Sequence, residues 1–379
     1  MGDYVRQLPE GSADLARRPG AAQRLHLDLP LLALLAGLTA YGLVVLYSAS
    51  GQDYGAVIRQ GRFFLVAYVV MIVAAQIELK TYMRFAPLFY LLGVGLLVAV
   101  MYFGVGAKGA QRWLSIGGFR FQPSEIMKLG VPLMVGWYLA ERILPPRFKY
   151  VVGALLIVVL PSALILSQPD LGTALLIAAS GLFVVFMAGI GWRYIVGAVV
   201  LAIASAWPAW IFVLKDYQKQ RILTLLNPES DKLGAGWNII QSKTAIGSGG
   251  WDGKGWMSGT QSQLDFLPES HTDFIIAVLA EEFGLRGVLL LMCLYLLILL
   301  RGFWIGLHAQ TTFGRLMAGS LTLTFFVYIF VNMGMVAGLL PVVGVPLPLV
   351  SAGGTSVVTL MAGFGLLMAV STERKVLAR

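Results

Sequence analysis

The residues best suited to chemistry lie at the end of the longest polar segment of the chain, between Gly247 and Phe283. A glycine-rich turn region is followed by Glu269, His271 and Asp273, which stand directly before an apolar run. A carboxylate held at such a boundary can accept a proton from a hydroxyl group as a general base. A structural interpretation is also open, because Ser270 and Asp273 match a Ser-x-x-Asp capping box at a helix start.

A second group of charged residues begins another apolar run. Glu125 and Lys128 are three positions apart, so on a helix they share one face and can neutralise each other. Ionisable residues inside an apolar span are costly and usually face a polar interior. The pair is therefore either a structural ion pair or part of the lining of a substrate cavity. Glu282 and Arg286, four positions apart, are expected to pair in the same way.

A third polar stretch, Gln168-Pro169-Asp170, connects two apolar runs and is short enough to predict a tight turn. Asp170, with Thr173 three positions later, resembles the N-terminal cap of a helix. A contact between Asp170 and a substrate is equally open, and the two roles are compatible.

The elements that must position these residues are membrane helices. With 58% hydrophobic residues, 12% charged residues and a mean hydropathy of +0.79, the chain of 379 residues does not fit a soluble domain. We predict the all-α class: a polytopic membrane protein whose transmembrane helices each need about 20 apolar residues. The ten candidate spans are 29–50, 63–79, 85–103, 124–140, 150–167, 171–190, 194–213, 273–300, 316–340 and 346–371.

Basic residues set the expected orientation of these spans. The positive-inside rule places one group of them in the cytoplasm: Lys80, Arg84, Arg142, Arg147, Lys149, Arg193, Arg301, Arg315, Arg374 and Lys375. Residues 1–28 and 372–379 are then cytoplasmic tails, and 29–371 form a single membrane domain with a long structured extracytoplasmic loop at 214–272. Topology and anionic lipid account for the net charge of +9, so nucleic acid is not an expected partner.

Other patterns in the chain bound its structure and its chemistry. Apolar positions recur at helical spacing in 217–226, and 237–245 is a second amphipathic piece. Two prolines and two glycines between Pro346 and Gly354 predict a kinked or unwound start for the last span, buried in protein or lining a polar cavity. The single Cys293 excludes an intrachain disulfide. The sequence contains no P-loop, dinucleotide fingerprint or metal-ligand spacing, which argues against an ATP-driven pump or a redox enzyme.

Several longer motifs resemble one bacterial family. They are Lys108-Gly-Ala-Gln-Arg-Trp-Leu, Gln122-Pro-Ser-Glu, Gln168-Pro-Asp-Leu-Gly-Thr, the run from Gly247 to Gln263, Phe266-Leu-Pro-Glu-Ser-His-Thr-Asp-Phe and Pro346-Leu-Pro-Leu-Val-Ser-Ala-Gly-Gly. Spread over essentially all ten spans, they resemble the shape, elongation, division and sporulation (SEDS) family. The short termini resemble its elongation-specific members more than its division-specific ones.

The resemblance implies a peptidoglycan glycosyltransferase of the bacterial cytoplasmic (inner) membrane, serving cell-wall elongation and rod shape. Its implied substrate is lipid II, a disaccharide-pentapeptide on an undecaprenyl pyrophosphate carrier, polymerised on the outer face. Asp273 is the implied essential carboxylate, and Gln111, Arg112, Glu125 and Lys128 are implied to serve the substrate. The implied partners are a class B penicillin-binding protein transpeptidase and other proteins of the elongation complex.

On this interpretation Asp273 accepts the proton of an acceptor 4-hydroxyl, which attacks an anomeric carbon as undecaprenyl pyrophosphate leaves from the opposite face. The leaving group needs positive charge in a low-dielectric site, for which the candidates are Lys108, Arg112, Lys128 and Lys254. A divalent cation, Mg²⁺ or Mn²⁺, can share that role, although the sequence shows no dedicated metal site. The further candidate substrate contacts are Gln168, Asp170, Glu269 and His271.

The competing interpretation is a lipid II flippase, because ten spans, buried charges and a broken helix also suit a transporter. The lack of a clear inverted repeat and the clustering of polar groups on the outer side favour the enzyme. A non-catalytic scaffold would not need a carboxylate at Asp273. Spans eight and nine are expected to receive the membrane helix of the transpeptidase, since small residues permit close helix approach. Those residues are Gly314, Gly319, Gly334 and Gly338.

Overall fold

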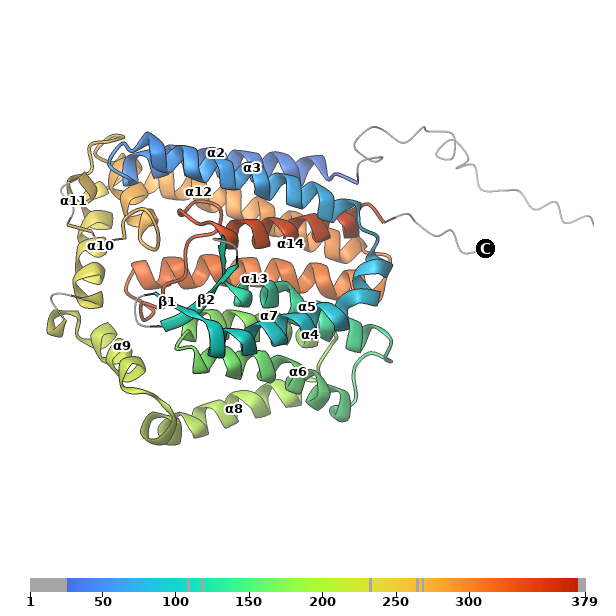
Figure 1. Cartoon of the computed structure of the whole chain (residues 1–379). Helices are drawn as coiled ribbons and strands as arrows, with labels where there is room; N and C mark the ends of the chain where they lie inside the picture. The colour runs from blue at the N-terminus through green and yellow to red at the C-terminus, as the bar shows by residue number, and fades with distance from the viewer. Residues whose placement is uncertain are drawn as a thin grey trace, which may run out of the picture.

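The computed structural model describes residues 26–107, 110–116, 119–231, 234–263, 266–267 and 269–373. Within them the chain forms a bundle of long α-helices (Figure 1), which confirms the all-α class. Ten helices take up the ten predicted spans: α2 Leu29–Ala49, α3 Tyr54–Gln76, α4 Leu79–Phe103, α5 Pro123–Ala140, α6 Phe148–Ser167, α7 Leu171–Met187, α8 Trp192–Pro208, α12 Ile275–His308, α13 Thr312–Val336 and α14 Thr355–Ser371.

The bundle has the surface of a membrane protein. Among the described residues, seven helices are long and apolar enough to cross a membrane, counting α8 with its extension; α7 and α14 are apolar but shorter. Large side chains such as Leu91, Leu156 and Phe330 are more than half exposed on the outside of the bundle. Hydrocarbon, unlike water, solvates such side chains without cost.

Two span boundaries differ most from the prediction. The second span begins at Tyr54 instead of 63, because the carboxylate of Asp53 caps α3 by accepting from the backbone N–H groups of Gly55 (2.7 Å) and Ala56 (3.1 Å). The polar residues of this first part hid the helix from a search for apolar runs. The last span begins at Thr355 instead of 346, and the segment before it is not regular helix, as its prolines and glycines predicted.

The predicted ion pair between Glu282 and Arg286 is wrong. Gly284 has a positive φ of 62° inside α12, so the two residues are not on successive turns of one continuous helix. The hydroxyl of Ser48 donates to Glu282 (2.5 Å), and Arg286 pairs with Asp252 at 2.6 Å. The break exists because the glycine-rich turn after residue 249 forms backbone hydrogen bonds with α12 there, for example from Gly255 N–H to the Glu282 carbonyl (3.0 Å).

The small-residue face predicted on the ninth span is also wrong. The glycines concerned, Gly314, Gly319, Gly334 and Gly338, face other parts of this protein. A Cβ atom at Gly319, for instance, would lie 2.5 Å from the Sδ of Met187 on α7. These glycines permit α13 to pack within the bundle and leave no groove for a partner helix at these positions.

The connection between α4 and α5 contains a small sheet that the sequence did not predict. Strands β1 Val105–Ala107, β2 Ala110–Ile116 and β3 Phe119–Phe121 pair antiparallel in the order β1-β2-β3. The partners Val105 and Trp113, and Leu114 and Phe121, set the register of the two strand pairs. Two strands of three residues are too short to show a period-2 pattern, so only the pairing reveals them.

The loop at 214–272 is structured, as predicted. A π-helical turn, Ala209–Val213, extends α8, and the loop contains α9 Asp216–Leu226, a 3₁₀ turn Pro228–Ser230, α10 Ala235–Gly249 and α11 Thr260–Gln263. Helices α9 and α10 correspond to the two predicted amphipathic pieces. In Figure 1 the helices of this loop and the small sheet gather at one end of the bundle, and the C-terminal end of α14 lies at the other.

Asp28 ties three helices together at the end of the bundle away from the sheet. Its carboxylate caps α2 by accepting from Leu31 N–H (3.0 Å) and also accepts from Arg301 of α12 (2.8 Å) and from the hydroxyl of Ser371 of α14 (2.6 Å). Burial by itself would raise the pKa of Asp28, but the hydrogen bonds from Arg301, Ser371 and Leu31 outweigh it and lower the pKa.

A lowered pKa means that Asp28 stabilises the fold at pH values above its unfolded pKa, and that this contribution disappears as the pH falls through the folded pKa. Asp28→Asn keeps the cap but loses the charge, so we expect a loss of roughly 1.5–3 kcal/mol at neutral pH, the scale of charge-assisted hydrogen bonds. The gap to wild type should narrow below about pH 4. Thermal unfolding of both proteins in detergent, from neutral pH to below about pH 4, measures this difference in stability.

Asp53→Asn is the matched control, because Asp53 also caps a helix and pairs with an arginine, yet both side chains are more than half exposed. It should change stability little. Equal losses in the two variants would contradict the role given to Asp28.

Candidate active site

An open cleft of about 760 Å³ lies at the end of the bundle that carries the sheet. It is bounded by β2, the first turns of α5 and α7, the second half of α13 and the segment 344–356. Four of the predicted site residues line it together: Arg112, Glu125, Lys128 and Asp170. Residues that the sequence analysis did not single out, among them Phe63, Leu176 and Tyr328, line it as well.

Glu125 and Lys128 form the predicted ion pair, with 2.7 Å between Nζ and Oε1, and the pair lines the cleft. The side chains are only 9% and 15% exposed, and Lys128 also lies over the ring of Tyr328 at 5.2 Å. Glu125 Oε2 is buried and has no hydrogen-bond partner among the described residues. The pair is thus held in place, with one carboxylate oxygen left to accept a hydrogen bond.

Arg112 reaches the cleft from β2 and closes over the turn between α6 and α7. Its guanidinium donates to the carbonyls of Pro169 (2.5 Å) and Gln168 (3.4 Å) and lies 3.7 Å from Asp170 Oδ2. The two carbonyls and the carboxylate of Asp170, with which Arg112 forms an ion pair, orient the guanidinium, and the side chain is 32% exposed. Arg112 is therefore a positioned cation with an open side.

Asp170 serves two neighbours at once. Its Oδ1 caps α7 by accepting from Thr173 N–H (3.2 Å), which confirms the predicted cap, and its Oδ2 accepts from Gln122 (3.3 Å). Gln168 points elsewhere: its side chain is buried and donates to the Leu97 carbonyl of α4 (3.1 Å). Asp170 belongs to the cleft, whereas Gln168 contributes its backbone carbonyl to the setting of Arg112.

The loop that carries Asp273 is fixed through its backbone. Three consecutive carbonyls, those of residues 271–273, each accept one hydrogen bond, in order from Ala352 N–H (2.9 Å), Ser351 Oγ (2.5 Å) and Asn332 Nδ2 (2.9 Å). Asn332, fully buried in α13, also donates to the Val345 carbonyl (2.7 Å). The loop is therefore docked on the irregular segment before α14, and Asn332 holds both.

The carboxylate of Asp273 is half-buried and borders the cleft. Gly344, a cleft-lining residue with a positive φ of 74°, approaches it so closely that a Cβ atom there would lie 3.5 Å from Asp273 Oδ2. The capping box with Ser270 is wrong: α12 begins at Ile275 with no side-chain cap, and the Ser270 hydroxyl donates to the Ala49 carbonyl (3.0 Å). The structural alternative for Asp273 thereby loses its basis.

Among the described residues, Lys254, Glu269 and His271 do not line the cleft. Lys254 donates to the fully buried Glu281 and to Thr260, both at 2.7 Å, and so fixes the glycine-rich turn to α12. Glu269, whose φ is +59°, accepts from the Thr272 hydroxyl (2.8 Å), and the side chain of His271 is exposed. The backbone of Gln111 lies on β2 beside Arg112. Lys108 and Asp265 lie outside the described residues.

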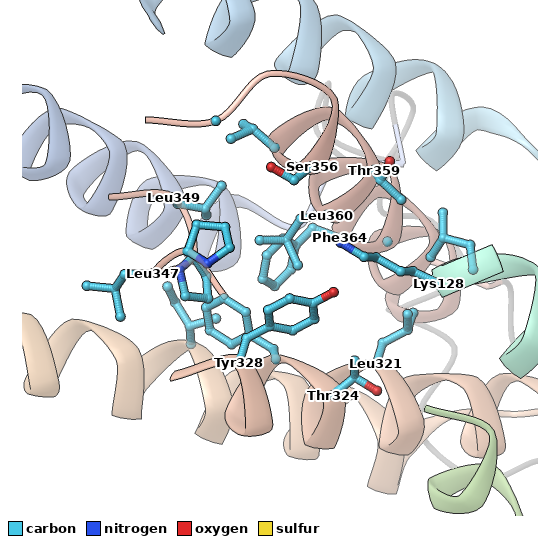
Figure 2. Close-up of a pocket in the computed structure, with 18 of the residues that line it drawn as sticks. Lys128, Leu321, Thr324, Tyr328, Leu347, Leu349, Ser356, Thr359, Leu360 and Phe364 are labelled. Carbon is cyan, nitrogen blue, oxygen red and sulfur yellow. The ribbon is translucent and has the colours of Figure 1, made fainter. Parts of the chain in front are cut away.

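A narrow apolar cavity of about 70 Å³ continues the cleft between α13 and α14. Figure 2 shows Leu321, Leu360 and Phe364 around it, with the polar ends of Lys128 and Tyr328 reaching into the same space. The cavity and the cleft share five lining residues: Lys128, Tyr328, Pro346, Gly353 and Ser356. A ligand with a charged head and a long apolar chain fits this sequence of environments.

Comparisons with known proteins agree with this geometry. The family model of the cell cycle proteins FtsW, RodA and SpoVE matches residues 29–376. The chain is 55% identical to the peptidoglycan glycosyltransferase MrdB of Escherichia coli, over 94% of this chain and 96% of that protein. It is 38% identical to a probable peptidoglycan glycosyltransferase FtsW of Geobacter metallireducens, over 92% and 95%. The predicted family is confirmed, and the chain is more similar to MrdB than to this FtsW.

Solved structures share the fold. A chain from a peptidoglycan synthase complex, described as coordinating polymerization and crosslinking, superposes with a TM-score of 0.81 at 31% identity, covering 92% of this chain and 98% of that one. The rod shape determining protein RodA of Thermus thermophilus superposes with a TM-score of 0.69 at 29% identity, covering 92% and 97%.

Removing one member of the buried pair should cost more than removing both. Lys128→Ala leaves Glu125 uncompensated in a partly dry site, and we expect a loss of about 3–5 kcal/mol of stability together with turnover. The double variant Glu125→Gln, Lys128→Met should recover stability, measured by thermal unfolding, but not turnover. Recovered turnover would leave the pair with a structural role only.

Asn332 is expected to act on turnover through the Asp273 loop. Asn332→Leu has similar volume but cannot donate, so the Asp273 and Val345 carbonyls lose a buried donor, at roughly 1–3 kcal/mol. Without this donor the Asp273 loop should shift and displace the Asp273 carboxylate, which should lower kcat by about 10- to 100-fold with little change in KM. Ser320→Ala is the control, since it removes another buried hydrogen bond of α13, to the Ser180 carbonyl (2.7 Å), outside the site. An equal fall in kcat in both variants would show that α13 packing, not the loop, is responsible.

Proposed function

Because this chain belongs to the family of FtsW, RodA and SpoVE, the SEDS family, its activity is that of a peptidoglycan glycosyltransferase, and we propose that it polymerises lipid II. One observation carries the choice of substrate. A polar cleft with Arg112 and Lys128 opens directly into an apolar cavity, while Asp273 is fixed at the rim of the cleft. Lipid II has the matching parts: a sugar-pyrophosphate head and an undecaprenyl chain.

The pyrophosphate lies near Lys128 and Arg112 in this proposal, and the first part of the polyprenyl chain enters the apolar cavity. Lys128 is already paired with Glu125, so it orients the head more than it adds net charge. Arg112 is paired less closely, with Asp170 at 3.7 Å, and keeps an open side from which its guanidinium stabilises the charge of the leaving group. Lys108, which follows β1 in the sequence and lies outside the described residues, is proposed as a further cation for the same group.

Asp273 is the proposed base. Its carboxylate accepts the proton of the acceptor 4-hydroxyl as that oxygen forms a bond to the anomeric carbon of the donor sugar. The bond from the anomeric carbon to the pyrophosphate oxygen breaks, and its electron pair leaves on undecaprenyl pyrophosphate. Docking of the loop through residues 271–273 supports this role, because a base must hold its position through the displacement.

A divalent cation held by protein ligands does not fit this cleft. The described residues contain no group of three or more His, Cys, Asp and Glu side chains placed to bind a metal ion. The oxygens of Asp170 are engaged by Thr173, Gln122 and Arg112. The proposed steps therefore use the arginine and lysine side chains of this chain. A role for Mg²⁺ or Mn²⁺ remains a proposal, which is tested by measuring polymerisation as either metal is added.

The protein is an integral protein of the bacterial inner membrane, as its apolar helices and its relatives indicate. We propose that both termini are cytoplasmic and that the cleft faces outward, where the glycan is needed. We further propose a class B penicillin-binding protein as partner, together with other elongation-complex proteins. Exposed apolar side chains of α12 and α13, such as Leu297 and Phe330, offer its membrane helix a surface in place of the buried glycines.

The flippase alternative is less well supported. Asp170 caps α7 and Glu125 lies in the first turn of α5, so these polar groups lie at helix ends at one side of the bundle. A transporter that alternates access needs its polar site near the middle of the membrane. The cleft is better suited to a reaction at one face.

Asp273→Asn separates catalysis from structure. Asn keeps the backbone hydrogen bonds and the size of the side chain but cannot be an anionic base, so polymerisation should fall by about 10²-fold or more while stability and lipid II binding stay near wild type. The assay gives purified protein labelled lipid II and resolves glycan products by length. Polymer formed without other enzymes supports the function proposed.

Asp252→Asn is the control, since this carboxylate is 67% exposed, pairs with Arg286 and lies outside the cleft. It should polymerise normally. A near wild-type rate for Asp273→Asn would remove Asp273 as the base and make Glu269 the next residue to test, followed by Asp265.

A further inference from the structure

A second polar pocket, of about 530 Å³, lies at the end of the bundle opposite the cleft. It is formed where α5 ends, where α7 turns toward α8 and where α13 begins, and Arg142 and Arg315 both line it. Helix α5 runs from the cleft to this pocket over 18 residues. At 1.5 Å per residue that is roughly 27 Å, close to the thickness of the hydrocarbon layer. The cleft and the pocket therefore lie at the two opposite membrane interfaces.

The two arginines of this pocket are not neutralised by a carboxylate of the described residues. Within the part of the chain that the structure describes, neither forms an ion pair with a carboxylate. The Arg142 guanidinium lies over the rings of Tyr150 (4.8 Å) and Tyr138 (5.6 Å), which fix its direction and leave its charge. The pocket thus presents two cations without a protein anion between them.

The acidic groups nearest in the sequence do not fill this role. Glu141, next to Arg142, is exposed and is not part of the pocket lining. Glu373 accepts a hydrogen bond from the Thr311 hydroxyl (3.2 Å), the residue that caps α13. Thr312, the first residue of α13, lines the pocket, so the positive end of the helix dipole adds to the two guanidinium charges.

The rest of the wall is apolar and lies at the level of the membrane interface. The lining is completed by Leu144, Pro145, Met187, Ala188, Gly189 and Leu316. Beside the pocket Trp192 begins α8 and is 73% exposed, which is typical of an aromatic side chain at the boundary between headgroups and hydrocarbon. A ligand here meets cations on one side and apolar surface on the other.

We propose that this pocket binds the phosphate headgroup of an anionic phospholipid, with Arg142 and Arg315 on the phosphate and the acyl chains along the apolar wall. The site is separate from the cleft and does not depend on the chemistry proposed there. A soluble phosphate would use the same two cations but would gain nothing from the apolar side. The position of the pocket favours the lipid.

The test uses the purified full-length protein and native mass spectrometry with phosphatidylglycerol or phosphatidylcholine as the probe. Wild type should retain phosphatidylglycerol at least about tenfold more strongly, since each cation near an anionic headgroup contributes about 1 kcal/mol. The variant Arg142→Gln, Arg315→Gln should lose about 25-fold in apparent affinity for phosphatidylglycerol, and each single variant about fivefold. Binding of phosphatidylcholine should hardly change.

Arg147→Gln, Arg193→Gln is the matched control. It removes the same charge from exposed residues near the same end of the bundle, neither of which lines the pocket. An equal loss in this control would show general attraction to the surface and overturn the site. If wild type shows no preference for phosphatidylglycerol over phosphatidylcholine, this result alone overturns the proposed site. Displacement by an equal concentration of free glycerol phosphate would replace the lipid with a soluble phosphate as the ligand.

Discussion

The candidate site depends on the docking of one loop onto one irregular segment. The carbonyls of residues 271–273 accept from Ala352, Ser351 and Asn332, and Asn332 also binds the carbonyl of Val345. Non-helical backbone at membrane depth is stable only when its polar groups are paired within the protein. The unwound start of the last span and the Asp273 loop provide those partners for each other, so neither can be placed without the other.

Near the Asp273 loop the backbone groups are hydrogen-bonded, but several buried side-chain atoms of the described residues are not. Glu125 Oε2, the Tyr328 hydroxyl and Asn332 Oδ1 are buried without a hydrogen-bond partner among the described residues. Each such group costs free energy, and native proteins keep few of them. Glu125 and Tyr328 both line the cleft, so a substrate that offers hydroxyl and amide groups can complete their hydrogen bonding. The cost is consistent with a site built to bind a polar head.

The surroundings of the cleft show how one ion pair serves packing and chemistry. Lys128 is held by Glu125 and by the ring of Tyr328, at the point where the polar cleft becomes the apolar cavity (Figure 2). The carboxylate of Glu125, 2.7 Å away, offsets the cost of burying the Lys128 charge at this place. The same arrangement sets the boundary between the environment for a charged head and the environment for a hydrocarbon chain.

The sequence by itself determined the all-α membrane class, the ten helical spans, the Glu125–Lys128 pair, the Asp170 cap and the motifs of the family. These follow from local quantities: the length of apolar runs, a spacing of three residues on a helix, and the identity of short segments. Tertiary structure decided the partners of Ser270, Arg286 and Lys254, the inward direction of the glycines of α13, and the role of Asn332. An asparagine in an apolar helix shows only that some buried partner is needed. Which partner it has depends on segments 13 and 59 residues away, and only the packed chain brings them together.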